Sequence, residues 1–265
     1  MPSLATFSSL GHGPTVLMLH GSGGNFRSFA PQVEALASVG FRGVSWNMPG
    51  YGQSAPIEPY SFMGLAASCV HLIEVLMADA PRRSVALVGH GMGGMLAQEV
   101  AVRRPDLVRH LVLVATAPAV LAGDAYHRLI TESLRWLDEG RDMAAIADTL
   151  LPRLVSPGAL PEGVQLATYC QSLVHAATWR RALGAMQGFD RRAALGHIAA
   201  PSLLVAGEHD RVTPPDTLAS MAQAIPGAQL LSLPGAGHLP HLEQPDAFDE
   251  ALINFLRTAR RKPLH

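Results

Sequence analysis

The chain is poor in cysteine, in charged residues and in long apolar runs. Its two cysteines, Cys69 and Cys170, are too few for a disulfide framework and are predicted to be buried thiols in a reducing compartment. Lys plus Arg number 20 and Asp plus Glu number 21. This balance excludes nucleic-acid and anionic-membrane partners bound through bulk charge. No apolar run reaches the roughly 18 residues that cross a membrane, and residues 1–15 lack a secretory pattern. We therefore expect a cytoplasmic protein.

Apolar residues, in contrast, are abundant enough for one domain with a large core. They make up 48% of the 265 residues, which excludes a disordered chain. Short apolar runs predict buried strands at Thr15–Leu19, Phe41–Trp46, Ser84–Val88, His110–Val114, Ser202–Val205 and Gln229–Leu233. Helical patterns between and after them cover Ser28–Ser38, Phe62–Met77, Met92–Arg103, Thr217–Ala224 and Ala247–Arg260. The alternation predicts an α/β fold with a mostly parallel sheet, helices on both faces and ligands bound at the carboxyl edge.

Residues 119–190 interrupt the alternation because they contain no convincing strand. Helical runs there predict a lid inserted into a core of residues 1–118 and 191–265; the runs are Ala125–Leu137, Met143–Leu150, Glu162–His175 and Trp179–Gly188. Large side chains of the lid are candidates for substrate contact, and packing within the lid is the alternative for each. The candidates are Tyr126, Trp136 and Trp179, with Tyr169 and His175 beside them.

Two glycine-rich segments follow predicted strands. His20–Gly24 comes first, and glycines such as Gly21 and Gly23 let backbone N–H groups approach an oxyanion. Gly89–Gly94 fits the dinucleotide fingerprint G-x-G-x-x-G. That fingerprint requires an acidic residue after the next strand, whereas His110–Val114 is followed by Ala-Thr-Ala. These residues therefore argue against nucleotide binding.

The second segment also matches the nucleophile elbow, G-x-S-x-G. Gly89 and Gly93 allow a sharp turn from strand to helix, which holds the residue between them at the edge of the sheet. The N–H of Met92, at the start of the helix, would face a developing oxyanion. Position 91 is glycine. Every part of the elbow is present except the side chain of the nucleophile.

An acid and a base follow the elbow in the expected order. Asp210 comes just after the strand Ser202–Val205, and His238 just after Gln229–Leu233. Hydrolases of this kind carry nucleophile, acid and histidine in this chain order. The imidazole moves a proton, and the carboxylate fixes its tautomer and stabilises the imidazolium. We predict that Asp210 and His238 form the remainder of a catalytic triad.

These motifs together resemble one family over nearly the whole chain. They are His20–Gly24, Asn47–Ser54, the elbow, Gly207–Pro214 and Gly237–Pro240 with Glu243 and Pro245 following. The chain resembles the α/β-hydrolases of the lidded, single-domain type, which include 3-oxoadipate enol-lactonases, small carboxylesterases and C–C bond hydrolases. The resemblance implies that the N–H groups of Ser22 and Met92 form the oxyanion hole, with Asp210 as acid and His238 as base.

The chain departs from the family pattern at three places. Residue 91 is glycine where the family has serine, and Asn47 replaces an aspartate, which we regard as minor. The segment before Thr15 is short, so the usual antiparallel hairpin is expected to shrink to one strand.

Three explanations of Gly91 are open. We favour an engineered serine-to-glycine replacement that inactivates a working serine hydrolase so that it traps a bound ester, because Asp210 and His238 have little other reason to occur together. In the second explanation, His238 is a general base that acts on water or on a substrate proton, as in a C–C bond hydrolase, lyase or cyclase. In the third, the protein only binds a ligand, and glycine relieves strain at the elbow.

The sequence therefore predicts a hydrolase of a small carboxylic ester or lactone, acting on a small-molecule carbonyl substrate. No cofactor is implied. A metal is not expected either, because His238 and His241, and the neighbouring Glu208, His209 and Asp210, show no repeated ligand spacing. Amides, thioesters and C–C bonds are cleaved by the same set of groups, so the bond that is broken stays open.

Overall fold

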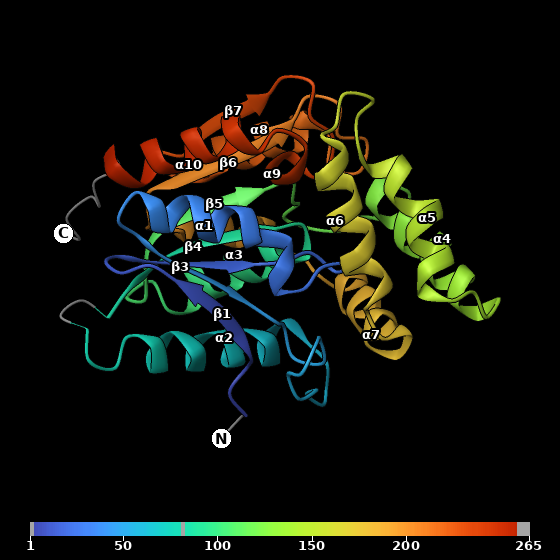
Figure 1. Cartoon of the computed structure of the whole chain (residues 1–265), viewed down its shortest axis with the longest axis horizontal. Helices are drawn as coiled ribbons and strands as arrows, with labels where there is room; N and C mark the ends of the chain where they lie inside the picture. The colour runs from blue at the N-terminus through green and yellow to red at the C-terminus, as the bar shows by residue number, and fades with distance from the viewer. Residues whose placement is uncertain (1–2, 81–82, 259–265) are drawn as a thin grey trace.

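The computed structural model describes residues 3–80 and 83–258, and its centre is a seven-stranded sheet (Figure 1). The strands are β1 (Phe7–Leu10), β2 (Thr15–Leu19), β3 (Arg42–Trp46), β4 (Val85–His90), β5 (Val108–Val114), β6 (Ser202–Gly207) and β7 (Gln229–Leu233). They lie in the order β1-β3-β2-β4-β5-β6-β7, with β1 antiparallel to β3 and the other pairs parallel. The predicted α/β class is confirmed, and the single strand β1 stands where a shortened hairpin was expected.

Helices cover both faces of the sheet, as predicted. One face carries α1 (Ala30–Ser38) and α10 (Pro245–Thr258), and the other carries α2 (Phe62–Leu76), α3 (Met92–Arg103) and α8 (Pro215–Ala224). Leu17 and Leu19 pack into the core on the α2 and α3 side, whereas Val16 and Met18 pack into the core on the α1 and α10 side. Successive side chains of a strand point to opposite faces. This is why β2 is buried at every position and apolar from Val16 to Leu19.

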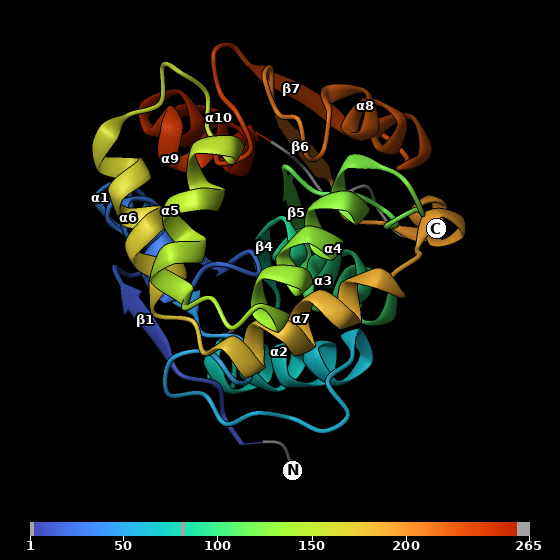
Figure 2. The same ribbon diagram turned by 90° about the vertical axis from the view of Figure 1, so that its right-hand side faces the viewer.

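Four helices lie between β5 and β6 in chain order. They are α4 (Ala125–Asp138), α5 (Met143–Leu154), α6 (Pro161–Ser172) and α7 (Ala176–Gln187). Figure 2 looks onto the carboxyl edge of the sheet and shows all four helices in front of it. The segments that lead into and out of them run side by side, because Ala119 and Asp190 form an antiparallel bridge and Arg191 N–H donates to the carbonyl of Pro118 at 2.7 Å. The chain thus leaves and rejoins the sheet at one place.

Several boundaries differ from the sequence prediction. β4 continues two residues beyond Val88 because Gly89 and His90 still pair with β5, although neither residue continues the apolar run. α5 continues through Pro152 to Leu154. Pro152 faces outward in the last turn, so the hydrogen bond it cannot make is lost on the solvent side. The predicted end of the last helix at Arg260 lies outside the described residues.

Close packing at the start of α3 fixes the helix against β2. A β-carbon on Gly93 would lie 2.6 Å from the carbonyl oxygen of His20, and closer still to that of Leu19. Only glycine permits this approach, because any side chain would push the helix away from the strand. The turn between β4 and α3 therefore depends on a residue without a β-carbon at position 93.

We predict that Gly93→Ala destabilises the fold by about 1–3 kcal/mol, the usual cost of overpacking. The matched control is Gly184→Ala in the exposed part of α7, where a β-carbon would meet nothing within 4 Å. That change should raise the free energy of unfolding by roughly 0.5–1 kcal/mol, because alanine has less backbone entropy to lose than glycine. Urea unfolding of both variants checks the pair, and equal effects would contradict the packing argument.

Candidate functional site

A buried acid–base pair lies at the carboxyl edge of the sheet. Asp210 follows β6 and His238 follows β7, and Nδ1 of His238 donates to Oδ2 of Asp210 at 2.8 Å. Asp210 is held in turn by the N–H groups of Val212 and Thr213 at 2.8 and 3.0 Å and by the Thr213 hydroxyl at 2.6 Å. The structure brings together the two residues that the sequence singled out, whereas no sequence pattern indicated Thr213.

These contacts keep Asp210 ionised. Burial alone would raise the pKa of Asp210, but the charge of His238 and hydrogen bonds from His238 and Thr213 outweigh it, so the net pKa lies below its usual value. An ionised carboxylate accepts the Nδ1–H of His238, which leaves Nε2 unprotonated in the neutral ring. The Nε2 atom can then accept a proton.

Two further histidines support the site without being charged. His90 donates from Nε2 to the backbone carbonyl of His238 at 2.8 Å. His20 contacts the carbonyl of Gly21 through Nδ1 at 2.7 Å and accepts the N–H of Met48 through Nε2 at 3.0 Å. Burial lowers the pKa of His20 to about 4 and that of His90 to about 3. Both are therefore neutral and act as fixed hydrogen-bonding groups.

The buried carboxylate of Glu243 holds the backbone around His238. It accepts the N–H groups of Gly237 and Leu239, on either side of His238, each at 2.8 Å. It also accepts the N–H of Ser156, just beyond α5, at 2.8 Å. His238 N–H itself donates to the carbonyl of Leu154 in α5 at 2.8 Å. The loop of His238 is therefore bound to the inserted helices as well as to the core.

The turn at Gly91 has the backbone of an elbow. Gly91 has φ of 53° and ψ of −117°, in a region that side chains rarely adopt. Its carbonyl accepts the Thr116 hydroxyl at 2.7 Å, and its N–H donates to Val114 at 3.0 Å. A β-carbon at Gly91 would meet Tyr126 Oη at 3.5 Å and His238 Nε2 at 3.9 Å, which are ordinary contacts. A side chain on residue 91 would therefore point at the imidazole.

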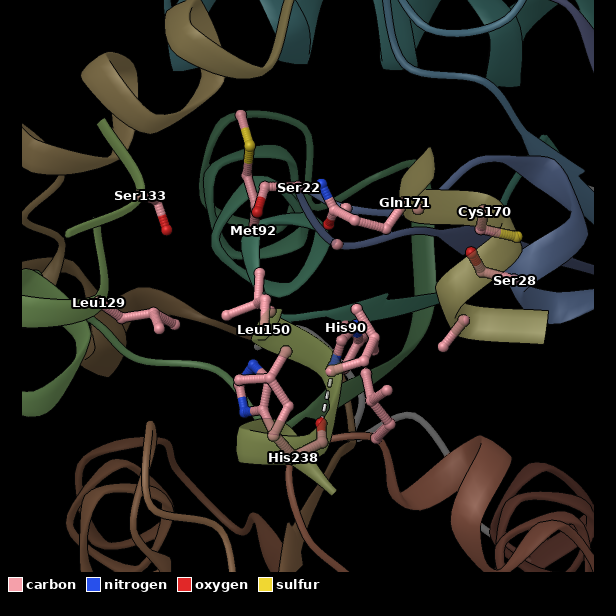
Figure 3. Close-up of a pocket in the computed structure, with 18 of the residues that line it drawn as sticks. Ser22, Ser28, His90, Met92, Leu129, Ser133, Leu150, Cys170, Gln171 and His238 are labelled. Carbon is pink, nitrogen blue, oxygen red and sulfur yellow. Dashed lines mark hydrogen bonds between the residues drawn. The ribbon is translucent and has the colours of Figure 1, made fainter. Parts of the chain in front are cut away.

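One cavity joins these groups (Figure 3). The predicted residues that line it are Gly21, Ser22, Gly23, Gly91, Met92, Tyr126, Trp179 and His238. Asp210 lies behind His238. Trp136 does not line the cavity: it is buried beside α5, with the guanidinium groups of Arg141 and Arg153 over its ring. Its proposed contact with substrate is therefore corrected to a packing role.

Several lining residues were not foreseen from the sequence. Apolar side chains of α4, α5 and α7 form one side, and polar groups near α6 form another; they include Leu129, Leu150, Leu183, Ser28, Cys170 and Gln171. Tyr169 and His175 are absent from the lining that the described residues form. Helical periodicity shows which residues share a face, but the face that meets the cavity depends on how the four helices cross. No motif marks these positions.

The comparison with known sequences decides the family. The alpha/beta hydrolase fold family matches residues 14–245. The chain belongs to this family. The family resemblance and the enzyme class, an α/β-fold hydrolase, are thereby confirmed.

Individual relatives agree with this placement. The chain is 31% identical over 256 residues to a pimeloyl-[acyl-carrier protein] methyl ester esterase of Chromobacterium violaceum, covering 94% of this chain and 97% of the relative. Among solved structures, an esterase from Thermogutta terrifontis matches with a TM-score of 0.84 at 26% identity, over 95% of this chain and 92% of that one. The enol-lactonase from Burkholderia xenovorans LB400 matches with a TM-score of 0.80 at 25% identity, over 95% of this chain and 96% of that one.

The described residues contain neither a cluster of metal ligands nor a membrane-spanning helix. Within residues 3–80 and 83–258, no three His, Cys, Asp or Glu side chains are grouped as metal ligands would be. In the same part of the chain, no helix has the length and hydropathy needed to cross a bilayer.

The buried histidines predict a loss of stability in acid. Unfolded histidine titrates near 6.5, whereas burial lowers the folded pKa of His90 to about 3. Between these values the unfolded chain binds more protons, so stability is complete above pH 6.5 and falls as the pH falls toward 3. Each such histidine contributes a slope of up to about 1.4 kcal/mol per pH unit.

Urea unfolding between pH 7 and 4 measures that slope. We expect His90→Gln, which can still donate to the His238 carbonyl, to have a shallower slope than the parent chain. The exposed His12→Gln is the control and should keep the parental slope. A parental slope in His90→Gln would show that its imidazole is not the group that titrates.

Glu243→Gln should destabilise the His238 loop. One carboxylate oxygen serves Ser156 and Gly237 and the other serves Leu239, so an amide would set an N–H₂ group against a backbone N–H. Leaving a buried donor unpaired costs about 1–3 kcal/mol. We expect a loss of this size in the free energy of unfolding. The same change at the exposed Glu250 of α10 should have almost no effect, and a similar effect at both sites would refute the role of Glu243.

Proposed function

We propose that this protein has the active site of a serine-type hydrolase of small esters and lactones, with the nucleophile position occupied by Gly91. The geometry at residue 91 carries the proposal. A β-carbon there would lie 3.9 Å from His238 Nε2 and contact nothing closer than 3.5 Å. One more bond would bring a seryl hydroxyl into hydrogen-bonding range of the base. With glycine, the site binds an ester without forming an acyl-enzyme.

The reaction of the serine form follows from the groups present. His238 Nε2 takes the seryl proton while the oxygen of residue 91 attacks the substrate carbonyl, and Asp210 stabilises the imidazolium. The tetrahedral intermediate collapses, and the alcohol leaves with the proton from His238. Water then attacks the acyl-enzyme, His238 takes its proton, and the acid is released with residue 91 restored.

The backbone N–H groups of Ser22 and Met92 are assigned to the oxyanion. Both residues line the cavity beside Gly91, and Met92 is the first residue of α3. The start of a helix carries a partial positive charge, and N–H groups fixed there stabilise a developing negative charge without reorganisation. Buried His20 supports the loop that contains Ser22 through its contact with Gly21.

We assign residues 119–190 as the lid and residues 1–118 and 191–265 as the core. The bridge between Ala119 and Asp190 supports this boundary. The lid supplies Tyr126 from α4 and Trp179 from α7 to the cavity. Burial raises the pKa of Tyr126, so its hydroxyl stays protonated beside residue 91 and is available as a hydrogen-bond donor to the substrate.

Ester and lactone substrates fit both the site and the relatives. An esterase and an enol-lactonase are among the relatives in the family. No Asp, Glu, Lys or Arg belongs to the cavity lining that the described residues form. A buried ionic group on the substrate would lack a counter-charge there, which is costly. The part of the substrate inside the cavity is therefore neutral.

Gly91→Ser should create a working esterase. We expect the hydrolysis rate of p-nitrophenyl acetate and p-nitrophenyl butyrate to rise by about 10³-fold or more, because the nucleophile is the part that the site lacks. The β-carbon at positive φ should lower the free energy of unfolding by about 1–3 kcal/mol. Release of p-nitrophenolate and urea unfolding measure the two effects.

Gly91→Ala is the matched control, because it introduces the same β-carbon without a hydroxyl. It should lose the same stability and stay as inactive as the parent chain. Adding His238→Ala to Gly91→Ser should return the rate to that of Gly91→Ala. A folded Gly91→Ser variant no faster than Gly91→Ala would refute the proposal. Slow hydrolysis by the Gly91 chain that His238→Ala abolishes would instead indicate water activated by His238.

A further inference from the structure

A polar side chain from α6 reaches the cavity without a hydrogen-bond partner. Gln171 is 3% exposed and lines the cavity. Its Nε2 atom is buried and has no partner among the described residues. Burying an amide without a hydrogen bond costs about 1–3 kcal/mol by mutational measures, so such a group calls for a partner that arrives with the ligand.

The backbone of His20–Gly24, the loop that contains Ser22, leaves room for this amide. The Cδ atom of Gln171 lies 2.9 Å from the place where a β-carbon on Gly23 would stand, and its Nε2 atom lies 3.7 Å from that place. A residue with a β-carbon at position 23 would occupy the same space as the Gln171 amide and displace it. Figure 3 shows the Gln171 side chain extending from α6 toward Ser22 and Met92. The amide oxygen is the atom nearest to Gly23, and the free Nε2 donor lies farther from it, in the cavity lining beside Ser22 and Met92.

The surroundings define what the donor can bind. The cavity lining within the described chain has no charged Asp, Glu, Lys or Arg side chain, so the acceptor is a neutral oxygen. Away from Gln171 the lining is formed by Leu129 and Leu150, with the hydroxyl of Ser133 beside them (Figure 3). One end of the substrate thus meets leucine side chains and one hydroxyl, and the other meets an amide N–H.

We propose that Gln171 is a specificity-determining residue whose Nε2–H donates to a neutral acceptor oxygen of the substrate next to the scissile ester. The preferred substrates are oxygen-substituted neutral esters, such as those with an ether, ketone or hydroxyl oxygen near the reacting carbonyl. An ester of the same shape with a methylene group in place of that oxygen leaves the buried amide unpaired and is disfavoured. This inference rests on the proposed function, since it places the ester at residue 91.

Two pairs of isosteric esters test the proposal. Methyl methoxyacetate and methyl butyrate differ by one ether oxygen on the acyl side, and 2-methoxyethyl acetate and butyl acetate differ by one on the alcohol side. Dissociation constants are measured with the Gly91 chain by ligand-observed NMR titration. No turnover is needed, so the result is independent of whether Gly91→Ser hydrolyses esters.

Gln171→Met removes the donor and keeps the side-chain length. In each pair we take the ratio of the affinity of the methoxy ester to that of the ester without the ether oxygen. We expect Gln171→Met to lower this ratio by about fivefold in one of the pairs, which is the factor that one neutral hydrogen bond supplies. Comparing variants cancels the different hydration of the two esters. Gln165→Met is the control, because Gln165 is an exposed residue of the same helix, and it should leave both ratios unchanged.

Three results would overturn the proposal. One is a change of less than twofold in both ratios for Gln171→Met, one is an equal change for Gln165→Met, and one is no binding of any of the four esters. If Gln171→Met does not fold, Gln171→Leu carries the same comparison. If the esters bind as expected but Gly91→Ser stays inactive, the specificity role of Gln171 stands and the serine-type reaction fails.

Discussion

The close approach of α3 to β2 is the constraint on which the site depends. Gly93 lets the first turn of α3 lie against the carbonyl groups that end β2. This places the N–H of Met92 and the backbone of Gly91 beside the loop that contains Ser22. Without that contact the strand, the turn and the loop of Ser22 would not meet, and His238 would not face residue 91.

The position of His238 is set by buried polar groups with fixed partners. Asp210 holds the His238 ring, His90 holds its carbonyl, and Glu243 holds the residues on either side. Hydrogen bonds of this kind contribute little net stability when they are made, but they cost much when one partner is removed. The result is a base whose position is determined by several groups at once, as catalysis through precise orientation requires.

The sequence was informative where local chemistry decides the structure. β2 is apolar from Val16 to Leu19 because it is buried on both faces. The segments after β6 and β7 present Asp210 and His238 at one edge because parallel strands end there. It failed where the packing of distant helices decides. Trp136 and Gln171 both lie on helices between β5 and β6, but only the second meets the cavity. Aromatic character pointed to the first, whereas an amide in mid-helix gave no signal. The continuation of α5 through Pro152 likewise depends on which side of the helix faces solvent.

The hydrogen bonds between the His238 loop and α5 have a mechanical consequence. His238 N–H is bound to Leu154, and Glu243 binds Ser156 together with the neighbours of His238. Any displacement of the end of α5 therefore displaces the imidazole relative to Gly91. The end of α5 and the imidazole are thus one mechanical unit. One backbone hydrogen bond and the carboxylate of Glu243 connect them. Because Leu154 also lines the cavity, the same helix sets both the wall of the cavity and the position of the base.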